Sequence, residues 1–472
     1  AEAHQRMGQI ALAIQDMRLI TTKYLSSNPQ FLVNDWSTLA RFEQRGGSMI
    51  KAIEAIEKAR SSITQNISGN YMFINRLAVS FYAQLGDFEA AEKSLRDAEA
   101  TMVMLRRSAN LGLYGKGWEA ELDTSRGIYF MYQGKWIEAE RSLRRAIRLR
   151  KENWEQLEAT PLANTEDARV LRSRQKLGFK QELAYRQLDL SQAILMQGRL
   201  VEAEVNARDG LALMLEVFNK NSTEVAAALN RLTRIIAEQG RAAESVLLAE
   251  EAIKTLKAGN AADEAISYVH ARKSLGAALV SDRKFKQADA VFVEMKAGIE
   301  KQVAAGEKKI PSTDLDWVIA MLKLGKHDDA EAMTHEMLGY TAKQSNVSEG
   351  RQNFLQAFNA MAIHAAGKDD QARAIYQKVM PKMVDRMRND DENRTGSTKQ
   401  QERVVMILED NISLLAKQTK SHPHTAAQAA AEAFSLADLA RGSSVQRALN
   451  ASAARANIKD PQLAALARKE QD

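Results

Sequence analysis

The chain has 472 residues, of which 45% are hydrophobic and 27% are charged, and its net charge is +6. It contains no cysteine, which excludes disulfides, thiolate metal ligands and a cysteine nucleophile within this sequence. The sequence contains no run of about 20 apolar residues, so it predicts no membrane-spanning helix. Residues 1–10 lack the basic and apolar regions of a signal peptide.

We expect an N-terminal capping helix over residues 1–30, followed by an internal repeat over residues 31–390. The repeat has a turn residue, usually glycine, and a small residue five positions later. Eight copies follow one another: GSMIKA (47–52), GDFEAA (86–91), GKWIEA (134–139), GRLVEA (198–203), GRAAES (240–245), RKFKQA (283–288), GKHDDA (325–330) and GKDDQA (367–372).

This pattern predicts a helical hairpin in each copy. Glycine suits the turn, because a helix commonly ends on a residue with positive φ. The small residue lies where the second helix approaches the first, and another small or apolar residue recurs two turns later, as with Ala91 and Ala98. The segments before the glycines have apolar residues at spacings of three and four, which is typical of amphipathic helices.

The eight copies resemble the tetratricopeptide repeat (TPR), whose turn is often followed by an aromatic residue such as Phe88, Trp136 or Phe285. The fold class we expect is therefore all-α, a right-handed superhelical solenoid of TPR-like helix pairs. The turns are mostly about 42 residues apart, against 34 in the standard repeat, and one step of 64 residues predicts an insertion near residues 155–180.

In such an array the first helix of each pair lines the concave side, where a protein or peptide binds. The repeat pattern predicts Arg76, Tyr185, Asn230, Arg234 and Lys273 on that face.

A second candidate surface is basic. Residues 141–180 hold eleven Lys or Arg and five acids, a surplus of six that equals the net charge of the chain. One hypothesis is an RNA or RNA–protein partner, bound through counterion release. The other is a solvated helix paired with acids elsewhere in the array. The candidate basic patch comprises Arg141, Arg144, Arg145, Arg148, Arg172 and Arg174.

The sequence contains no recognisable catalytic motif. THEMLG (334–339) lacks the second histidine of a zinc-protease helix, and LYGKGWEA (113–120) has neither phosphate-loop nor dinucleotide spacing. His422 and His424 flank Pro423 without further metal ligands nearby, and His270 and His364 are expected on helices as packing or concave-surface residues. We predict no catalytic residue, metal or cofactor in this chain.

After the repeats, residues 391–472 predict further helices that lead to a downstream domain. The segment from 431 to 472 resembles the junction between TPR array and peptidase in bacterial CHAT-family proteins, which are caspase-like and separase-like cysteine peptidases. The matching residues are Asp438, Ala440, Arg441, Gly442, Asp460, Pro461, Leu463, Ala464, Leu466, Arg468, Glu470, Gln471 and Asp472. The resemblance implies a peptidase domain in cis, with its His and Cys beyond this sequence.

The function we expect is the non-catalytic, regulatory region of a CHAT-type peptidase, which binds a partner protein or peptide in its concave groove and passes the binding event to the peptidase. The alternatives are a stand-alone TPR scaffold, and a regulator that docks RNA through residues 141–180. We expect a soluble protein of the bacterial cytoplasm or periplasm, with the absence of cysteine favouring export.

Overall fold

The computed structural model describes all residues of the chain except 7–8, 25–27, 64–68, 108–110, 262–264, 305–310, 343–348, 390–397, 422–423, 425 and 457–472. Its secondary structure is helical throughout the described ranges, with no strand in them. The prediction of an all-α fold built from TPR-like helix pairs is confirmed.

The helices are α1 (Glu2–Arg6), α2 (Ile10–Lys23), α3 (Pro29–Gly46), α4 (Met49–Ser61), α5 (Gly69–Leu85), α6 (Phe88–Leu105), α7 (Leu111–Tyr132), α8 (Trp136–Ala159), α9 (Glu166–Leu195), α10 (Leu200–Val217), α11 (Thr223–Glu238), α12 (Ala242–Ala258), α13 (Ile266–Ser281), α14 (Phe285–Ala304), α15 (Leu315–Lys323), α16 (His327–Ala342), α17 (Glu349–Ala365), α18 (Asp369–Asn389), α19 (Thr398–Ser421) and α20 (Ala426–Ala456).

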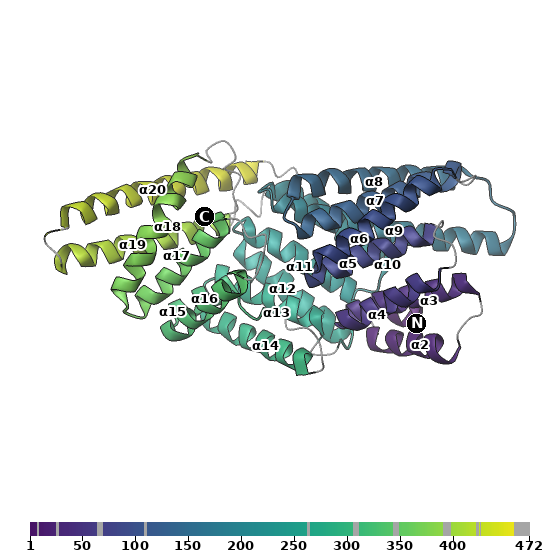
Figure 1. Cartoon of the computed structure of the whole chain (residues 1–472), viewed down its shortest axis with the longest axis horizontal. Coiled ribbons are helices and arrows are strands. Elements are labelled where there is room, and N and C mark those ends of the chain that lie inside the picture. The colour runs from purple at the N-terminus through teal and green to yellow at the C-terminus, as the bar shows by residue number, and fades with distance from the viewer. Residues whose placement is uncertain are drawn as a thin grey trace. The chain divides into compact units, whose positions relative to one another are not determined.

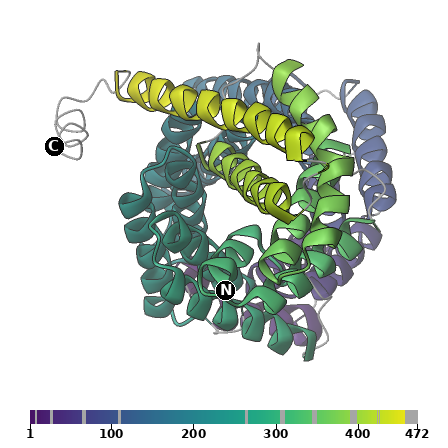
Figure 2. The same cartoon turned by 90° about the vertical axis from the view of Figure 1, so that its left-hand side faces the viewer.

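The chain divides into two compact units. Unit 1 comprises residues 1–234, 247–274 and 293–310, and unit 2 comprises residues 235–246, 275–292 and 311–472. In unit 1, α3 to α10 lie side by side as four successive pairs (Figure 1). In unit 2, α15 packs on α16 and α17 on α18, and α19 lies along α20 (Figure 2).

The eight predicted turns share one backbone conformation. Seven glycines, from Gly47 to Gly367, have φ between 74° and 101°, and Arg283 takes the equivalent place with φ of 57°. At each turn, the N–H of the residue that follows the turn residue donates to the carbonyl five residues earlier; Asp87, for example, donates to Tyr82 at 2.9 Å. This is the Schellman motif, which satisfies carbonyls that a helix end would otherwise leave unpaired. The second helix of every pair begins two residues after the turn residue.

The small residues of the repeat allow the two helices of a pair to pack closely. The residue five positions after the turn is fully buried in all eight copies: Ala52, Ala91, Ala139, Ala203, Ser245, Ala288, Ala330 and Ala372. Glycines have the same role elsewhere, because a Cβ on Gly210 would lie 2.8 Å from Leu188 and 3.2 Å from the carbonyl of Ala184. Close packing therefore explains the spacing that the sequence shows.

Two expected regions differ from the structure. The stretch 1–30 was predicted as one capping helix, but it holds α1 and α2 and the first residues of α3. Gly8, a weak helix former, lies between α1 and α2 in the sequence. The insertion near 155–180 is almost entirely helical, with only residues 160–165 outside α8 and α9. Pro161 explains the short break, and the Thr165 hydroxyl starts α9 by accepting the N–H of Ala168 at 3.3 Å.

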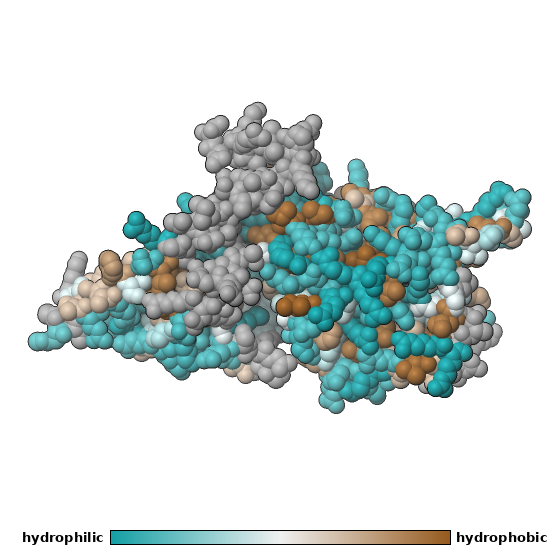
Figure 3. Space-filling view, turned by 90° about the horizontal axis from the view of Figure 1, so that it is seen from above, coloured by the Kyte–Doolittle hydropathy of each residue, from teal (hydrophilic) through white to brown (hydrophobic). Residues whose placement is uncertain are grey.

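Hydrophobic side chains at the surface are scattered. On the face shown in Figure 3, small groups of them lie among a larger hydrophilic area. Within the described part of the chain, no helix is both long and apolar enough to cross a membrane.

Candidate binding groove

The predicted concave residues lie on first helices of their pairs, and three of them line one cavity. Arg76 of α5, Tyr185 of α9 and Arg234 of α11 contribute to a cavity of about 430 Å³ in unit 1, which we call the inner cavity. Asn230 of α11 and Lys273 of α13 are not among its lining residues.

The inner cavity is lined almost entirely by the first helices of five successive pairs, α3, α5, α7, α9 and α11. Arginines dominate its polar lining, and solvent reaches it, since Tyr132 and Arg234 are exposed. The lining residues are Arg41, Gln44, Arg45, Arg76, Leu77, Ser80, Phe81, Ile128, Met131, Tyr132, Trp136, Gln181, Glu182, Tyr185, Arg186, Asp189, Gln192, Arg231 and Arg234.

Arg76 is the centre of a buried ion-pair network. Its guanidinium is 2.5 Å from the Glu121 carboxylate on α7 and 3.4 Å from Glu182 on α9. Arg150 of α8 also pairs with Glu121. Burial alone would raise the pKa of Glu182, but the positive charges of Arg76 and Arg150 outweigh it and lower that pKa to about 2. These contacts fix α5, α7 and α9 relative to one another.

A second network joins α3 to α9 and α11. Arg45 donates to the Tyr185 hydroxyl and forms an ion pair with Glu224 at 2.9 Å. Glu224 also accepts the side-chain amide of Gln5 at 2.7 Å. Burial raises the pKa of the Tyr185 hydroxyl, so it remains a neutral partner. Tyr185, predicted as a ligand-contacting residue, therefore already has a structural partner in Arg45.

Three lining arginines have no carboxylate partner within the described chain: Arg41, Arg231 and Arg234. Arg231 donates to the side-chain oxygen of Gln192, and Arg234 contacts the same oxygen at 3.4 Å. Burial, and then the neighbouring charge of Arg45, lower the pKa of Arg41 to about 10. The inner cavity thus contains three arginines that form no ion pair with a carboxylate in the described ranges.

Arg186 of α9 is the most enclosed of the lining arginines that lack full pairing. It is 4% exposed, and one of its terminal nitrogens is 3.3 Å from Asp189 on the next turn. Its Nε and other terminal nitrogen, Nη1, have no hydrogen-bond partner in the part of the chain that the structure describes. Buried guanidinium donors are normally satisfied, so this arginine stands out.

Sequence reasoning did not find Arg41, Arg45, Arg186 and Arg231. A signal was nevertheless present for Arg41, because the position six residues before the turn lines the inner cavity in five successive pairs. These positions hold Arg41, Ser80, Ile128, Gln192 and Arg234. An alignment of the eight copies on their turns would have predicted this register.

The predicted basic patch is largely neutralised on α8. Arg144 pairs with Glu140 at 2.8 Å and with Glu202 of α10, Arg145 lies 3.2 Å from Asp123 of α7, and Arg148 lies 3.8 Å from Glu152. On α9, Arg172 donates to the carbonyl of Thr160 at 3.2 Å. Arg141 and Arg174 have no ion pair in the described ranges. The hypothesis of a helix paired with acids elsewhere in the array fits this arrangement better than a free cationic surface.

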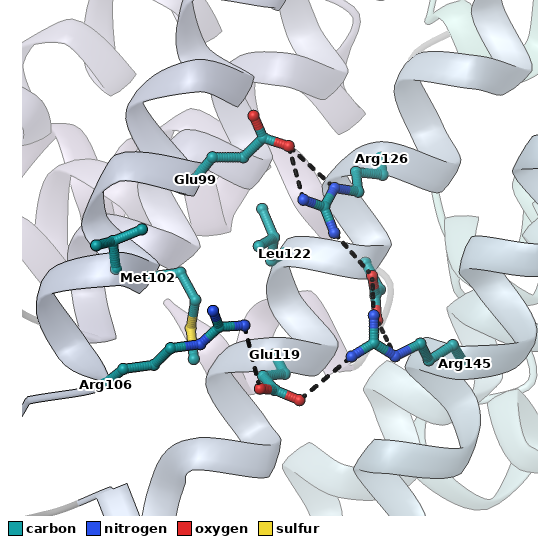
Figure 4. A pocket seen from close by; sticks show the side chains of 9 residues that line it. Glu99, Met102, Arg106, Glu119, Leu122, Arg126 and Arg145 are labelled. Atoms are coloured by element: carbon teal, nitrogen blue, oxygen red, sulfur yellow. Dashed lines mark hydrogen bonds and ion pairs between the residues drawn. The ribbon is translucent and has the colours of Figure 1, made fainter.

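A smaller cavity of about 280 Å³ between α6, α7 and α8 shows the same neutralisation (Figure 4). Arg126 binds Glu99 at 2.7 Å, Arg106 lies 3.6 Å from Glu119, and Arg145 lies 3.5 Å from Glu119. Three arginines and three carboxylates line it, so its charge is balanced internally.

His270 and His364 have different surroundings within their own units. His364 of α17 contacts Asp410 of α19 at 2.9 Å, whereas His270 of α13 lies near Lys273 and Arg231. Desolvation of the imidazole by the surrounding protein, and then the charges of these two cations, lower the pKa of His270 to about 4. Residues 422 and 423 lie outside the described chain, as do residues 460–472, which carry most of the CHAT resemblance. Among the residues described, no group of His, Asp and Glu has the arrangement of a metal site.

No protein-family model matches the chain, and no curated protein matches it. Among solved structures, a Rap protein complexed with Competence and Sporulation Factor is 11% identical, with 89% of this chain and 100% of that chain covered and a TM-score of 0.48. Aspartyl phosphate phosphatase F from Bacillus subtilis is 13% identical, covering 88% and 94%, with a TM-score of 0.45. Human IFIT1 with PPP-AAAA is 13% identical, covering 97% and 95%, with a TM-score of 0.40. Similarities of this size carry no functional argument, and none of these comparisons supports a CHAT relationship.

Proposed function

We propose that this chain is a protein-interaction array that binds a short segment of a partner protein in the inner cavity. The observation that carries the proposal is the lining itself. Five successive first helices contribute polar and aromatic side chains to one solvent-reachable cavity of about 430 Å³, within the range typical of ligand sites. Solenoids of this kind use such extended concave surfaces for binding.

The proposal is tested by selecting random peptides on the full-length chain and then blocking the cavity. Ser80 lines it on α5, so Ser80→Trp adds bulk inside the groove. We expect selected peptides to bind this variant about tenfold more weakly or worse, a loss of about 1.4 kcal/mol. Lys93→Trp on the exposed face of α6 is the matched control. Equal binding of the peptides to both variants would reject the cavity as the site.

A finer proposal is that the array regulates a CHAT-type cysteine peptidase domain in cis. Its support is the sequence resemblance at residues 438–442 and 460–472. A ligand in the inner cavity would then act on the peptidase by favouring one curvature of the array over another. This requires that the ligand bind the two curvatures with different affinity. The test is to read the native gene beyond the codon for Asp472. A continuing frame with a His and a Cys in the following domain supports the proposal, and a stop codon there rejects it.

A further inference from the structure

The inner cavity contains hydrogen-bond donors that the protein itself does not use. Arg186 is 4% exposed, yet its Nε and Nη1 lack acceptors in the described chain. An unsatisfied buried donor is costly, and more so when the group is charged. Arg186 is therefore available to donate to an acceptor on a molecule that enters the cavity.

The charge of the lining points to the kind of acceptor. Six arginines line the inner cavity against two carboxylates, Glu182 and Asp189. Glu121 and Glu224 offset two of the arginines from outside the lining, through Arg76 and Arg45. The remaining surplus is positive, and it includes Arg231, which donates to the neutral side-chain amide of Gln192.

Arg186 and Arg231 are linked through one face of α9, on which Arg186, Asp189 and Gln192 follow at intervals of three residues. Asp189 pairs with Arg186 at 3.3 Å, and Arg231 donates to the side-chain oxygen of Gln192. Both guanidinium groups line the cavity. Arginine favours carboxylate and phosphate oxygens because its donors match their planar geometry.

We infer that Arg186 and Arg231 form an anion subsite that takes the side-chain carboxylate of an acidic residue in the bound peptide segment. This inference rests on the proposed function and specifies the chemistry of the partner. Charge complementarity favours a peptide over a nucleic acid. Glu182 and Asp189 line the same cavity and would repel a continuous phosphate backbone, whereas a peptide presents single carboxylates that can avoid them.

The test uses peptides selected on the full-length chain as described above. We expect the selected peptides to be enriched in Asp or Glu. Replacing the acidic residue of a selected peptide by Asn or Gln should weaken binding about 10- to 100-fold, as expected for loss of a charged hydrogen bond. This arm changes the peptide alone, so it is independent of the folding of any variant.

In the protein, Arg186→Gln and Arg231→Gln should each weaken binding of the acidic peptide about tenfold or more. Binding of the peptide that carries Asn or Gln in place of the acid should remain nearly unchanged. Arg231 is partly exposed, so its variant is the safer one for folding. Arg141→Gln on the exposed face of α8 is the control, because Arg141 has no ion pair in the described ranges.

The possible failures are distinguishable. Peptides that lack acids but are still blocked by Ser80→Trp would overturn the anion subsite and leave the proposed function in place. Peptides that bind the Ser80→Trp variant as tightly as the wild type would overturn both the anion subsite and the proposed function. If a single-stranded RNA oligonucleotide displaces the acidic peptide and a neutral peptide does not, the ligand is a phosphate polyanion and the acidic-peptide inference is overturned.

Discussion

The carboxylate of Asp316 in α15 accepts from Arg403 in α19 at 2.7 Å, although the two residues are 87 positions apart in the chain. Lys399, one turn before Arg403, lies 2.7 Å from the other carboxylate oxygen. Asp316 is 3% exposed, so one buried carboxylate holds two cations of α19 against the seventh helix pair within unit 2.

Removing this carboxylate should destabilise unit 2. Asp316→Asn leaves two cations without their counter-charge, and loss of one partner from a buried ion pair typically costs about 3–5 kcal/mol. We expect a lower midpoint of urea unfolding, measured by circular dichroism. Glu402→Gln, at an exposed position on α19, is the control and should leave the midpoint unchanged. A variant as stable as the wild type would show that the Asp316 carboxylate contributes no net stability to unit 2.

The same carboxylate predicts a loss of stability in acid. Burial would raise the pKa of Asp316, but Lys399 and Arg403 outweigh it and lower the pKa to about 2. A lowered pKa in the folded state stabilises the fold above the unfolded pKa, near 4, and this contribution is lost as the pH falls towards 2. The difference in unfolding midpoint between wild type and Asp316→Asn should therefore shrink between about pH 4 and pH 2. A constant difference across that range would contradict this assignment.

His364 predicts the opposite pH dependence. Its hydrogen bond to Asp410, which also accepts from Tyr376 at 2.7 Å, raises the pKa of the imidazole above its usual value of about 6.5. Asp369 adds to this effect and Lys417 opposes it. The protonated histidine therefore stabilises the fold below about pH 6.5, and this contribution is lost as the pH rises through the folded-state pKa.

His364→Gln should accordingly destabilise the protein more at pH 5.5 than at pH 8.5, as measured by thermal unfolding at both values. His335→Gln, at an exposed position on α16, should show no such difference. Equal effects of His364→Gln at the two pH values would indicate that the imidazole contributes only packing.

Close helix packing predicts the effect of adding one methyl group. Gly210→Ala would bring Cβ within 2.8 Å of Leu188 and 3.2 Å of the Ala184 carbonyl, and the backbone atom cannot rotate away. We expect a loss of about 1–3 kcal/mol in unfolding free energy. Gly178→Ala is the matched control on α9, since nothing lies within 4 Å of its added Cβ. That change should raise stability by up to about 1 kcal/mol through helix propensity.

The turn at Arg283 predicts a stabilising substitution. Arg283 has a φ of 57°, where the other seven turns have glycine. A non-glycine residue in this conformation costs about 1–2 kcal/mol, so Arg283→Gly should raise the unfolding midpoint slightly. Gly86→Ala is the reverse experiment, because nothing lies within 4 Å of the added Cβ and only the φ of 78° opposes it. A gain in stability from Gly86→Ala would contradict the argument.

The helix pairs could be predicted from sequence because their determinants are local. A residue with positive φ, a small residue five positions on and apolar residues at helical spacing each act within one hairpin. The chain between Ala159 and Glu166 shows where this reasoning fails. The spacing of the turns predicted an insertion near residues 155–180 but not its structure, in which only residues 160–165 interrupt the helices.

The inner cavity could be predicted only in part, since its chemistry depends on pairings between distant residues. Arg76 and Tyr185 were expected to face a ligand, yet their partners Glu121 and Arg45 belong to other repeats. Conversely, Arg186 became notable only when its neighbours were known, because an unpaired donor cannot be recognised from sequence. For the same reason the sequence did not show which acids pair with residues 141–180, such as Glu202 with Arg144 and Asp123 with Arg145.

The cavity-lining position six residues before each turn has a consequence for how such arrays diversify. In five successive pairs this position holds arginine, serine, isoleucine, glutamine and arginine, whereas the position five residues after the turn holds alanine in four of the same pairs and serine in the fifth. The first position varies in charge and size while the second is nearly fixed. If the inner cavity binds a partner as proposed, its specificity can change by exchange at the first set of residues, while the second set keeps the hairpins intact.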